Sequence, residues 1–238
     1  MKLSLSRLVL LPLTLAAGAC AHSAGTAPHE MSAAEHQAAA QNEDQQAGGH
    51  EAQYDANARQ STVSCKPSRG RVCWTAWENP TKEHNVSAAE HHELAAKHRA
   101  ASKELADAEA RECAGLSDED RDVSPFARGA DISSVAQLKE DKRVGKASVS
   151  REAGATIVFR AAPGLTAEWL QRIVDCHLAR NSAVGHDMPE MSYCPLVPRG
   201  AQAKVHSSGD GFAVDVRSDD AETAAEIWKR AQQLSIKP

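Results

Sequence analysis

The C-terminal part of the sequence, residues 131–238, predicts an α+β fold in which an antiparallel sheet carries helices on one face. Two observations support this class. Four short stretches are rich in alternating or β-branched apolar residues, and two longer segments repeat apolar residues at helical spacing. Their order along the chain is strand, strand, helix, strand, strand, helix. About 100 residues are enough for a domain that folds alone.

Each element has its own local signal. The first strand is expected at 132–138 and the second at 155–161, where Pro163 and Gly164 stop it. Thr166 then caps a helix whose apolar positions run from Trp169 to Leu178. Strands at 201–207 and 211–217 form a hairpin through the turn at 208–210, and a last helix spans about 220–234. This order resembles the ferredoxin-like class.

The N-terminus has the three parts of an export signal. Lys2 and Arg7 precede a short apolar run at 8–17, and small residues follow up to Cys20. The end of this segment resembles a bacterial lipoprotein signal, in which a cysteine such as Cys20 becomes the lipidated first residue. That resemblance implies removal of residues 1–19 and anchoring by acyl chains. Ordinary secretory cleavage after Ala19 or Ala21 is the alternative.

Residues 20–60 are expected to form a disordered tether. From residue 21 on, this stretch has no Val, Ile, Leu, Phe, Trp or Cys and is rich in Ala, Gln, Glu, Gly and His. Such a composition buries too little apolar surface to offset the entropy of ordering. We therefore divide the chain into a signal peptide (1–19), the tether (20–60), a disulfide hairpin with an Ala-rich helix (61–130) and the α+β domain (131–238).

One piece of the tether is repeated. Residues 29–36 and 84–91 are identical at six of eight positions, and both contain Ser-Ala-Ala-Glu. This pattern is typical of a capping box, so both copies are expected to start helices. The second helix should continue to a C-cap at Gly115. Its apolar face is thin, which leaves it either partly exposed or packed on the first copy as a shallow hairpin.

The cysteines predict disulfide bonds in an oxidising compartment. Cys65 and Cys73 flank a Pro/Gly turn and are expected to close a hairpin. Their spacing does not resemble the close pairs of a zinc site. Cys176 and Cys194 are expected to pair as well, which leaves Cys113 as a thiol, an intermolecular link or the partner of one of these two.

A second interpretation of residues 176–194 is a metal site. His177, His186, Met188 and Met191 lie close together in sequence between the two cysteines, and imidazole with thioether or thiolate suits Cu(I). Because a disulfide would remove both thiolates, the two interpretations require opposite states of sulfur. We favour the disulfide, so no cofactor is expected, and copper or zinc is the alternative.

Other chemistry finds little support. His91 and His98 stand seven residues apart on one helix, about 10.5 Å, too far for one ion unless a histidine such as His29 or His36 joins from another segment. His92 begins no HExxH sequence, because position 96 is Ala. The acidic run at 118–122 lacks the Gly and Glu of a calcium loop. Phosphate-binding and nucleophile-elbow sequences do not occur.

Charge excludes one further class. The net charge is −5, and it falls to −7 when residues 1–19 leave with Lys2 and Arg7, so nucleic acid is not an expected partner. We expect a bacterial cell-envelope lipoprotein at the outer membrane, facing the periplasm or the surface, with a structural or binding role and no enzymatic activity. The expected partner is the membrane, through the lipid anchor, and the sequence names no protein partner. The alternative function is copper or zinc binding through residues 176–194.

Overall fold

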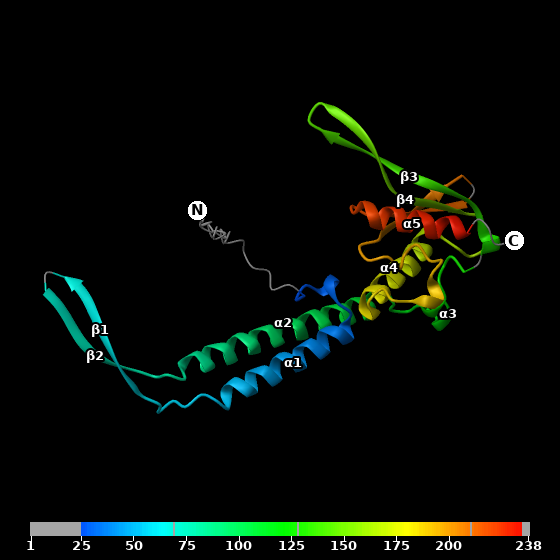
Figure 1. Cartoon of the computed structure of the whole chain (residues 1–238). Coiled ribbons are helices and arrows are strands. Elements are labelled where there is room, and N and C mark those ends of the chain that lie inside the picture. The colour runs from blue at the N-terminus through cyan, green and yellow to red at the C-terminus, as the bar shows by residue number, and fades with distance from the viewer. Residues whose placement is uncertain (1–24, 69, 128, 210, 235–238) are drawn as a thin grey trace, which may run out of the picture.

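An α+β domain and a long arm make up the computed structural model (Figure 1). It describes residues 25–68, 70–127, 129–209 and 211–234. The predicted signal peptide and Cys20 lie outside these residues. Two antiparallel helices form the arm, and a two-stranded ribbon extends from its far end. No helix in the described residues is long and apolar enough to span a bilayer.

The arm consists of α1 (Ala33–Glu51) and α2 (Lys82–Glu112), which lie side by side along the length of α1. Ser32 caps α1, because its Oγ accepts from the backbone N–H of Glu35 at 3.1 Å and Glu35 accepts from the N–H of Ser32 at 2.7 Å. The tether prediction is therefore wrong for residues 33–51. Alanines at 40 and 47 are fully buried against α2, and their small size lets two helices with few large apolar groups approach closely.

The two copies of the repeat have different roles. The first starts α1, as predicted. The second copy, at 84–91, lies inside α2, which begins five residues before Ser87 at Lys82, so the predicted helix start there is wrong. The predicted C-cap also differs, because α2 ends at Glu112 with Cys113 as its cap. Gly115, with φ +73°, belongs to the turn that follows.

The ribbon consists of β1 (Gln60–Ser68) and β2 (Gly70–Glu78), paired antiparallel with Cys65 directly opposite Cys73. These two cysteines form the predicted disulfide bond. The ribbon pairs with no other strand among the described residues, so both of its edges are open. Figure 1 shows it at the opposite end of the arm from the α+β domain.

The α+β class predicted for residues 131–238 is confirmed, with the predicted order of elements. The sheet has the order β3-β4-β6-β5 and is antiparallel throughout. Its strands and helices are β3 (Ile132–Val144), β4 (Ala147–Phe159), α4 (Ala167–Val184), β5 (Gln202–Ser208), β6 (Gly211–Arg217) and α5 (Ala221–Leu234). Thr166 caps α4 as predicted, accepting from the N–H of Trp169 at 3.1 Å. The ferredoxin-like resemblance stays a prediction.

The core lies between the sheet and its two helices. Cross-strand pairs such as Ile157 with Val214 and Ala155 with Val216 are fully buried, and α4 and α5 contribute Val174 and Ile227 to the same cluster. The short helix α3 (Asp118–Asp122) leads into a loop that adds Phe126 to this core. The described residues also include three short 3-10 turns, at Pro28–Glu30, Gly129–Asp131 and Pro189–Met191. The core therefore begins a few residues before the predicted boundary at 131.

A second disulfide bond joins the arm to the α+β domain. Cys113 at the end of α2 bonds to Cys176 on α4, so the predicted Cys176–Cys194 bond is wrong. The physical reason is the packing of α2 against α4, which brings Cys113 against the buried Cys176. Cys194 instead turns into the core as a buried thiol, 3.3 Å from the hydroxyl of Ser124. Of the three roles open to Cys113, pairing with Cys176 is the one observed.

Candidate functional site

Three layers of ionisable side chains cross the interface between α1 and α2. A histidine or glutamate recurs every seven positions on each helix, and buried alanines lie between these positions. A spacing of seven residues keeps side chains at the interface of two packed helices. From the α+β domain outwards, the layers are His36 with His98, Glu43 with His91, and His50 with His84. We call these the histidine layers.

The innermost layer is closed to solvent. The Nδ1 atoms of His36 and His98 lie 3.0 Å apart, and the two side chains are 0% and 6% exposed. Among the described residues, Nε2 of His36 has no hydrogen-bond partner. Burial lowers the pKa of His98, and His36 lowers it further, while Glu43 acts in the opposite direction. Burial of this layer therefore favours the neutral form of His98.

The outer two layers are more open. Nδ1 of His91 lies 2.6 Å from a carboxylate oxygen of Glu43, and Nδ1 of His50 lies 3.2 Å from Nδ1 of His84. The rings of His50 and His91 are nearly parallel, with centroids 5.4 Å apart. Beside them, the exposed His92 bonds to Glu51, and this hydrogen bond raises the pKa of His92.

The structure does not gather the predicted ligands of residues 176–194 into a site. Cys176 is in a disulfide bond, and Met191 is buried while Met188 packs against the same core. His177 donates from Nε2 to the carbonyl of Asp120 at 3.1 Å, and burial lowers its pKa. His186 donates from Nδ1 to the carbonyl of Val197 at 2.7 Å, and burial lowers its pKa too. Within the described ranges, no three His, Cys, Asp or Glu side chains already converge on one point.

This segment instead holds a loop onto α4. The buried amide of Asn181 donates to the carbonyl of Leu196 at 2.9 Å, and His186 holds the next residue of the same loop. His186 itself has a φ of +63°, an unusual value for a residue with a side chain. His177 and His186 therefore hold neighbouring loops in place through hydrogen bonds to backbone carbonyls, and the structure gives no reason to assign them to a metal.

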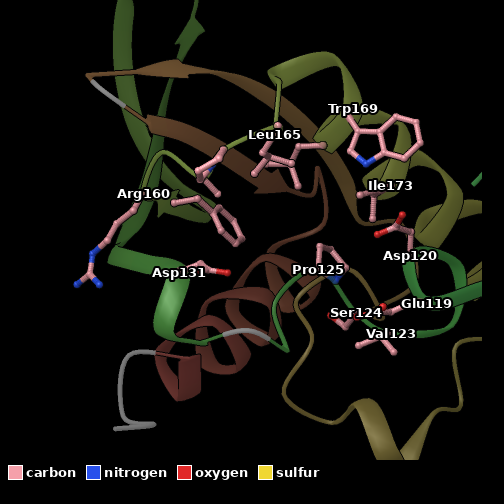
Figure 2. Close-up of a pocket in the computed structure, with 15 residues that line it drawn as sticks. Glu119, Asp120, Val123, Ser124, Pro125, Asp131, Arg160, Leu165, Trp169 and Ile173 are labelled. Carbon is pink, nitrogen blue, oxygen red and sulfur yellow. The ribbon is translucent and has the colours of Figure 1, made fainter. Parts of the chain in front are cut away.

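A cavity of about 270 Å³ opens between α3, the end of β4 and the start of α4 (Figure 2). Leu165, Trp169 and Ile173 form an apolar wall, Asp120 lies beside Ile173, and Asp131 lies on the opposite side. Arg160 is directed away from it, where its guanidinium donates to the carbonyl of Ala130. An apolar wall with carboxylates at its rim suits a small ligand that carries a positive charge.

The ribbon exposes large apolar side chains on both faces. Val63 and Trp77 share one face, and Val72 and Trp74 share the other, according to the strand register. Their exposed fractions are 72%, 68%, 60% and 43% respectively. Each face of the ribbon therefore carries an exposed tryptophan together with an exposed valine, which is typical of an interaction surface.

No family model, curated protein or solved structure matches the chain. The candidate sites therefore stand on geometry alone.

Sequence reasoning missed the histidine layers and the cavity. It noted that His91 and His98 would need a histidine from another segment, and the structure places His36 against His98. The signal that could have found the layers is the matched spacing of His36, Glu43 and His50 with the three histidines of α2. The cavity has no such signal, because its walls come from separated segments.

Proposed function

We propose that the chain is an exported cell-envelope protein with a binding role, in which the α+β domain is the base and the arm presents the ribbon to a protein partner. The observation that supports this most strongly is the group of exposed apolar side chains on the ribbon, Trp77 above all. A two-stranded hairpin is marginally stable in water. This one has a disulfide bond between its strands and no core of its own, so its apolar side chains are available for contacts with another molecule.

The arm is suited to hold the ribbon at a distance. α2 has 31 residues and so extends over about 46 Å. Its inner end is bonded to α4 through Cys113, and the helices are further joined by the histidine layers. A ribbon held in this way loses less conformational freedom on binding than one on a flexible tether.

Charge and position favour a protein over a lipid surface as the partner. Residues 59–78 contain four basic residues and one acidic residue, in a chain with a net charge of −5, so an acidic partner is complementary. Lys66 and Arg71 flank the turn, whereas Trp74 lies four residues behind it, about 13 Å along the strand. End-on insertion into a bilayer would carry the charge of Lys66 past the interface before either tryptophan reached it. An acidic protein surface that contacts the ribbon along its length avoids this cost.

Lipidation at Cys20 is part of the proposal and rests on the sequence. The chain enters α1 beside the α+β domain, where Arg199 bonds to the carbonyl of His29. An anchor nine residues before His29 would hold the domain near the membrane and leave the ribbon at the other end of the arm. The two disulfide bonds fit an oxidising compartment outside the cytosol.

Site-specific photo-crosslinking in the native host cells tests the protein partner. A crosslinking amino acid at position 77 should give one defined adduct, and the same group at the exposed Lys97 on the arm should not. The adduct partner is then purified and titrated against this protein. We expect the double variant Trp74→Ala/Trp77→Ala to weaken binding more than tenfold, as expected for aromatic anchors, while Thr62→Ala on the ribbon leaves it unchanged.

Two results would contradict this proposal. One is equal crosslinking from positions 77 and 97. The other is binding of the purified protein to vesicles of anionic phospholipid that is lost in Trp74→Ala/Trp77→Ala, since this would identify a lipid surface as the target of the ribbon.

A further inference from the structure

Three imidazoles and a carboxylate form a row at the outer end of the arm. His84 faces His50 with the two Nδ1 atoms 3.2 Å apart, His50 lies parallel to His91, and His91 contacts Glu43 at 2.6 Å. These four side chains come from both helices and lie on the same seam. Imidazole and carboxylate are ligands that Zn²⁺ and related ions bind.

The spacing of His50 and His84 matches that of metal ligands. Two nitrogens bound to one tetrahedral zinc ion, with bonds of about 2.0–2.1 Å, lie about 3.3 Å apart. Their rings would then have centres about 5 Å apart. The observed ring centroids of His50 and His84 are 5.5 Å apart. The rings of His50 and His91 are stacked, so the ring of His91 has to turn before its Nε2 can bind the same ion.

The contact between His91 and Glu43 points to the same chemistry. A carboxylate that accepts from Nδ1–H of a neutral histidine leaves Nε2 of that histidine with its lone pair. This is the arrangement in which metal-bound histidines usually occur, with one ring nitrogen on the metal and the other donating to a carboxylate. In the tautomer that donates from Nδ1 to Glu43, His91 has the form that a metal requires.

Access separates this row from the inner layer. His50, His84 and His91 are only partly buried, so an ion can reach them from solvent. The pair His36 and His98 has a similar Nδ1 to Nδ1 distance, but it is closed to solvent. The carboxylates of Glu43, Asp44 and Glu51 add negative charge around the row. One of these carboxylates, that of Asp44, is paired with Arg99.

We propose that His50 and His84 bind a divalent transition-metal ion such as Zn²⁺ across the two helices of the arm, with His91 as third ligand and Glu43 orienting His91. The described residues contain no preformed set of three ligands, so the side chains close around the ion as it binds. The bound ion joins the end of α1 to the start of α2, next to the segments that lead to the ribbon. This site is independent of the protein partner proposed above.

Calorimetric titration of the purified, metal-free full-length protein with ZnCl₂ at pH 7.5 tests the site. We expect one equivalent of Zn²⁺ to bind, with an affinity that falls at least tenfold in His50→Ala and in His84→Ala. Glu43→Gln should weaken binding by about 10- to 100-fold, which is the usual effect of removing a carboxylate that is hydrogen-bonded to a metal-bound histidine. Co²⁺ should give the visible absorption of a tetrahedral site in the wild type and in neither His50→Ala nor His84→Ala.

His92→Ala is the matched control, because His92 is the neighbour of His91 and is exposed and bonded to Glu51. It should bind Zn²⁺ like the wild type. Far-UV circular dichroism of every variant checks that the arm is folded. If a histidine variant does not fold, Glu43→Gln, which has almost the same shape as the wild type, still tests the site. Absence of Zn²⁺ binding to the wild type would overturn the proposal. Equal binding by the wild type and both histidine variants would do so too, as would a loss of binding only in His206→Ala on the sheet.

Discussion

His36 and His98 face each other inside the arm with their Nδ1 atoms 3.0 Å apart, and both rings are removed from water. A hydrogen bond between two imidazoles needs one protonated and one unprotonated Nδ1. Two imidazolium ions cannot form this hydrogen bond, and their positive charges would repel each other in a site of low polarity. The same residues that join the helices at neutral pH therefore make the arm sensitive to acid.

Acidification should loosen the arm. The pKa of His98 is lowered in the folded protein, mainly by burial and then by His36, so the unfolded chain binds a proton near pH 6.5 that the folded arm resists. The stabilisation is complete above pH 6.5 and is lost as the pH falls through the lowered pKa. Hydrogen exchange of α1 amides at pH 7.5 and 5.5, corrected for the intrinsic rate, measures this. The double variant His36→Leu/His98→Leu should show no difference in exchange between the two pH values, and His92→Ala should show the same difference as the wild type. If the double variant still lost protection at pH 5.5, the acid sensitivity would not come from His36 and His98.

Removing the Cys113–Cys176 bond should destabilise the whole protein. The bond closes a segment of 63 residues, and loss of such a crosslink costs about 4 kcal/mol in the chain-entropy model. We expect this decrease in the free energy of unfolding for Cys113→Ser/Cys176→Ala in urea titrations. Cys65→Ser/Cys73→Ser removes a loop of 8 residues, so about 2–3 kcal/mol should be lost locally in the ribbon with the urea midpoint of the α+β domain unchanged. A domain unaffected by the first pair of substitutions would show that the arm is not covalently held.

Among the described residues, Cys194 should be the one cysteine with a free thiol, and this thiol should not react in the native state. Burial raises the pKa of this thiol, and the side chain is 1% exposed, so thiolate is scarce and reagents have no access. Alkylation of unreduced protein should modify Cys194 in 6 M guanidinium chloride and leave it unmodified in buffer. Peptide mapping that recovers Cys194 in a disulfide with Cys176 would restore the pairing that the spacing in sequence suggests.

Gly154 should not tolerate a side chain. Its φ is +146°, and a Cβ there would lie 2.1 Å from the carbonyl oxygen of Val216 in the paired strand β6. Gly154→Ala should therefore lower the free energy of unfolding by about 2–3 kcal/mol, which urea titration measures. Gly145→Ala is the control, because its φ is +64° but nothing lies within 4 Å, so only about 1 kcal/mol should be lost. Equal effects at both positions would contradict the close strand contact.

Cys20 should carry acyl chains in the mature protein. Mass spectrometry of membrane-extracted material is expected to find a diacyl or triacyl group on this residue, and Cys20→Ser should release the protein from the membrane. A soluble mature form that begins at His22 or at an unmodified Cys20 would contradict lipid anchoring.

The α+β domain could be predicted because its signals are local. Thr166 caps a helix next to apolar residues at helical spacing, and Val214 and Val216 alternate with polar neighbours on a strand. Disulfide pairing could not be predicted in this way. Cys113 and Cys176 are joined by the packing of α2 on α4, and spacing in sequence contains no record of that contact.

The sequence left the packing of α1 on α2 as one alternative beside a disordered tether, for a different reason. Helix α1 has few large apolar residues, so composition alone indicates disorder. Its packing depends instead on Ala40 and Ala47, which allow close approach, and on His36, whose partner His98 is 62 residues away. The repeated Ser-Ala-Ala-Glu correctly predicted where α1 begins, but it could not show that a matching seam existed on α2.

Hydrogen–deuterium exchange of residues 33–51 in the intact protein tests most directly whether α1 and α2 form one arm. We expect the amides around Ala40 and Ala47 to be protected to the same degree as those around Ala88 and Ala95 on α2, because the four side chains are buried in one interface. Exchange of α1 at the rate of an unfolded chain, with α2 still protected, would show a free tether beside a single helix and would contradict the arm.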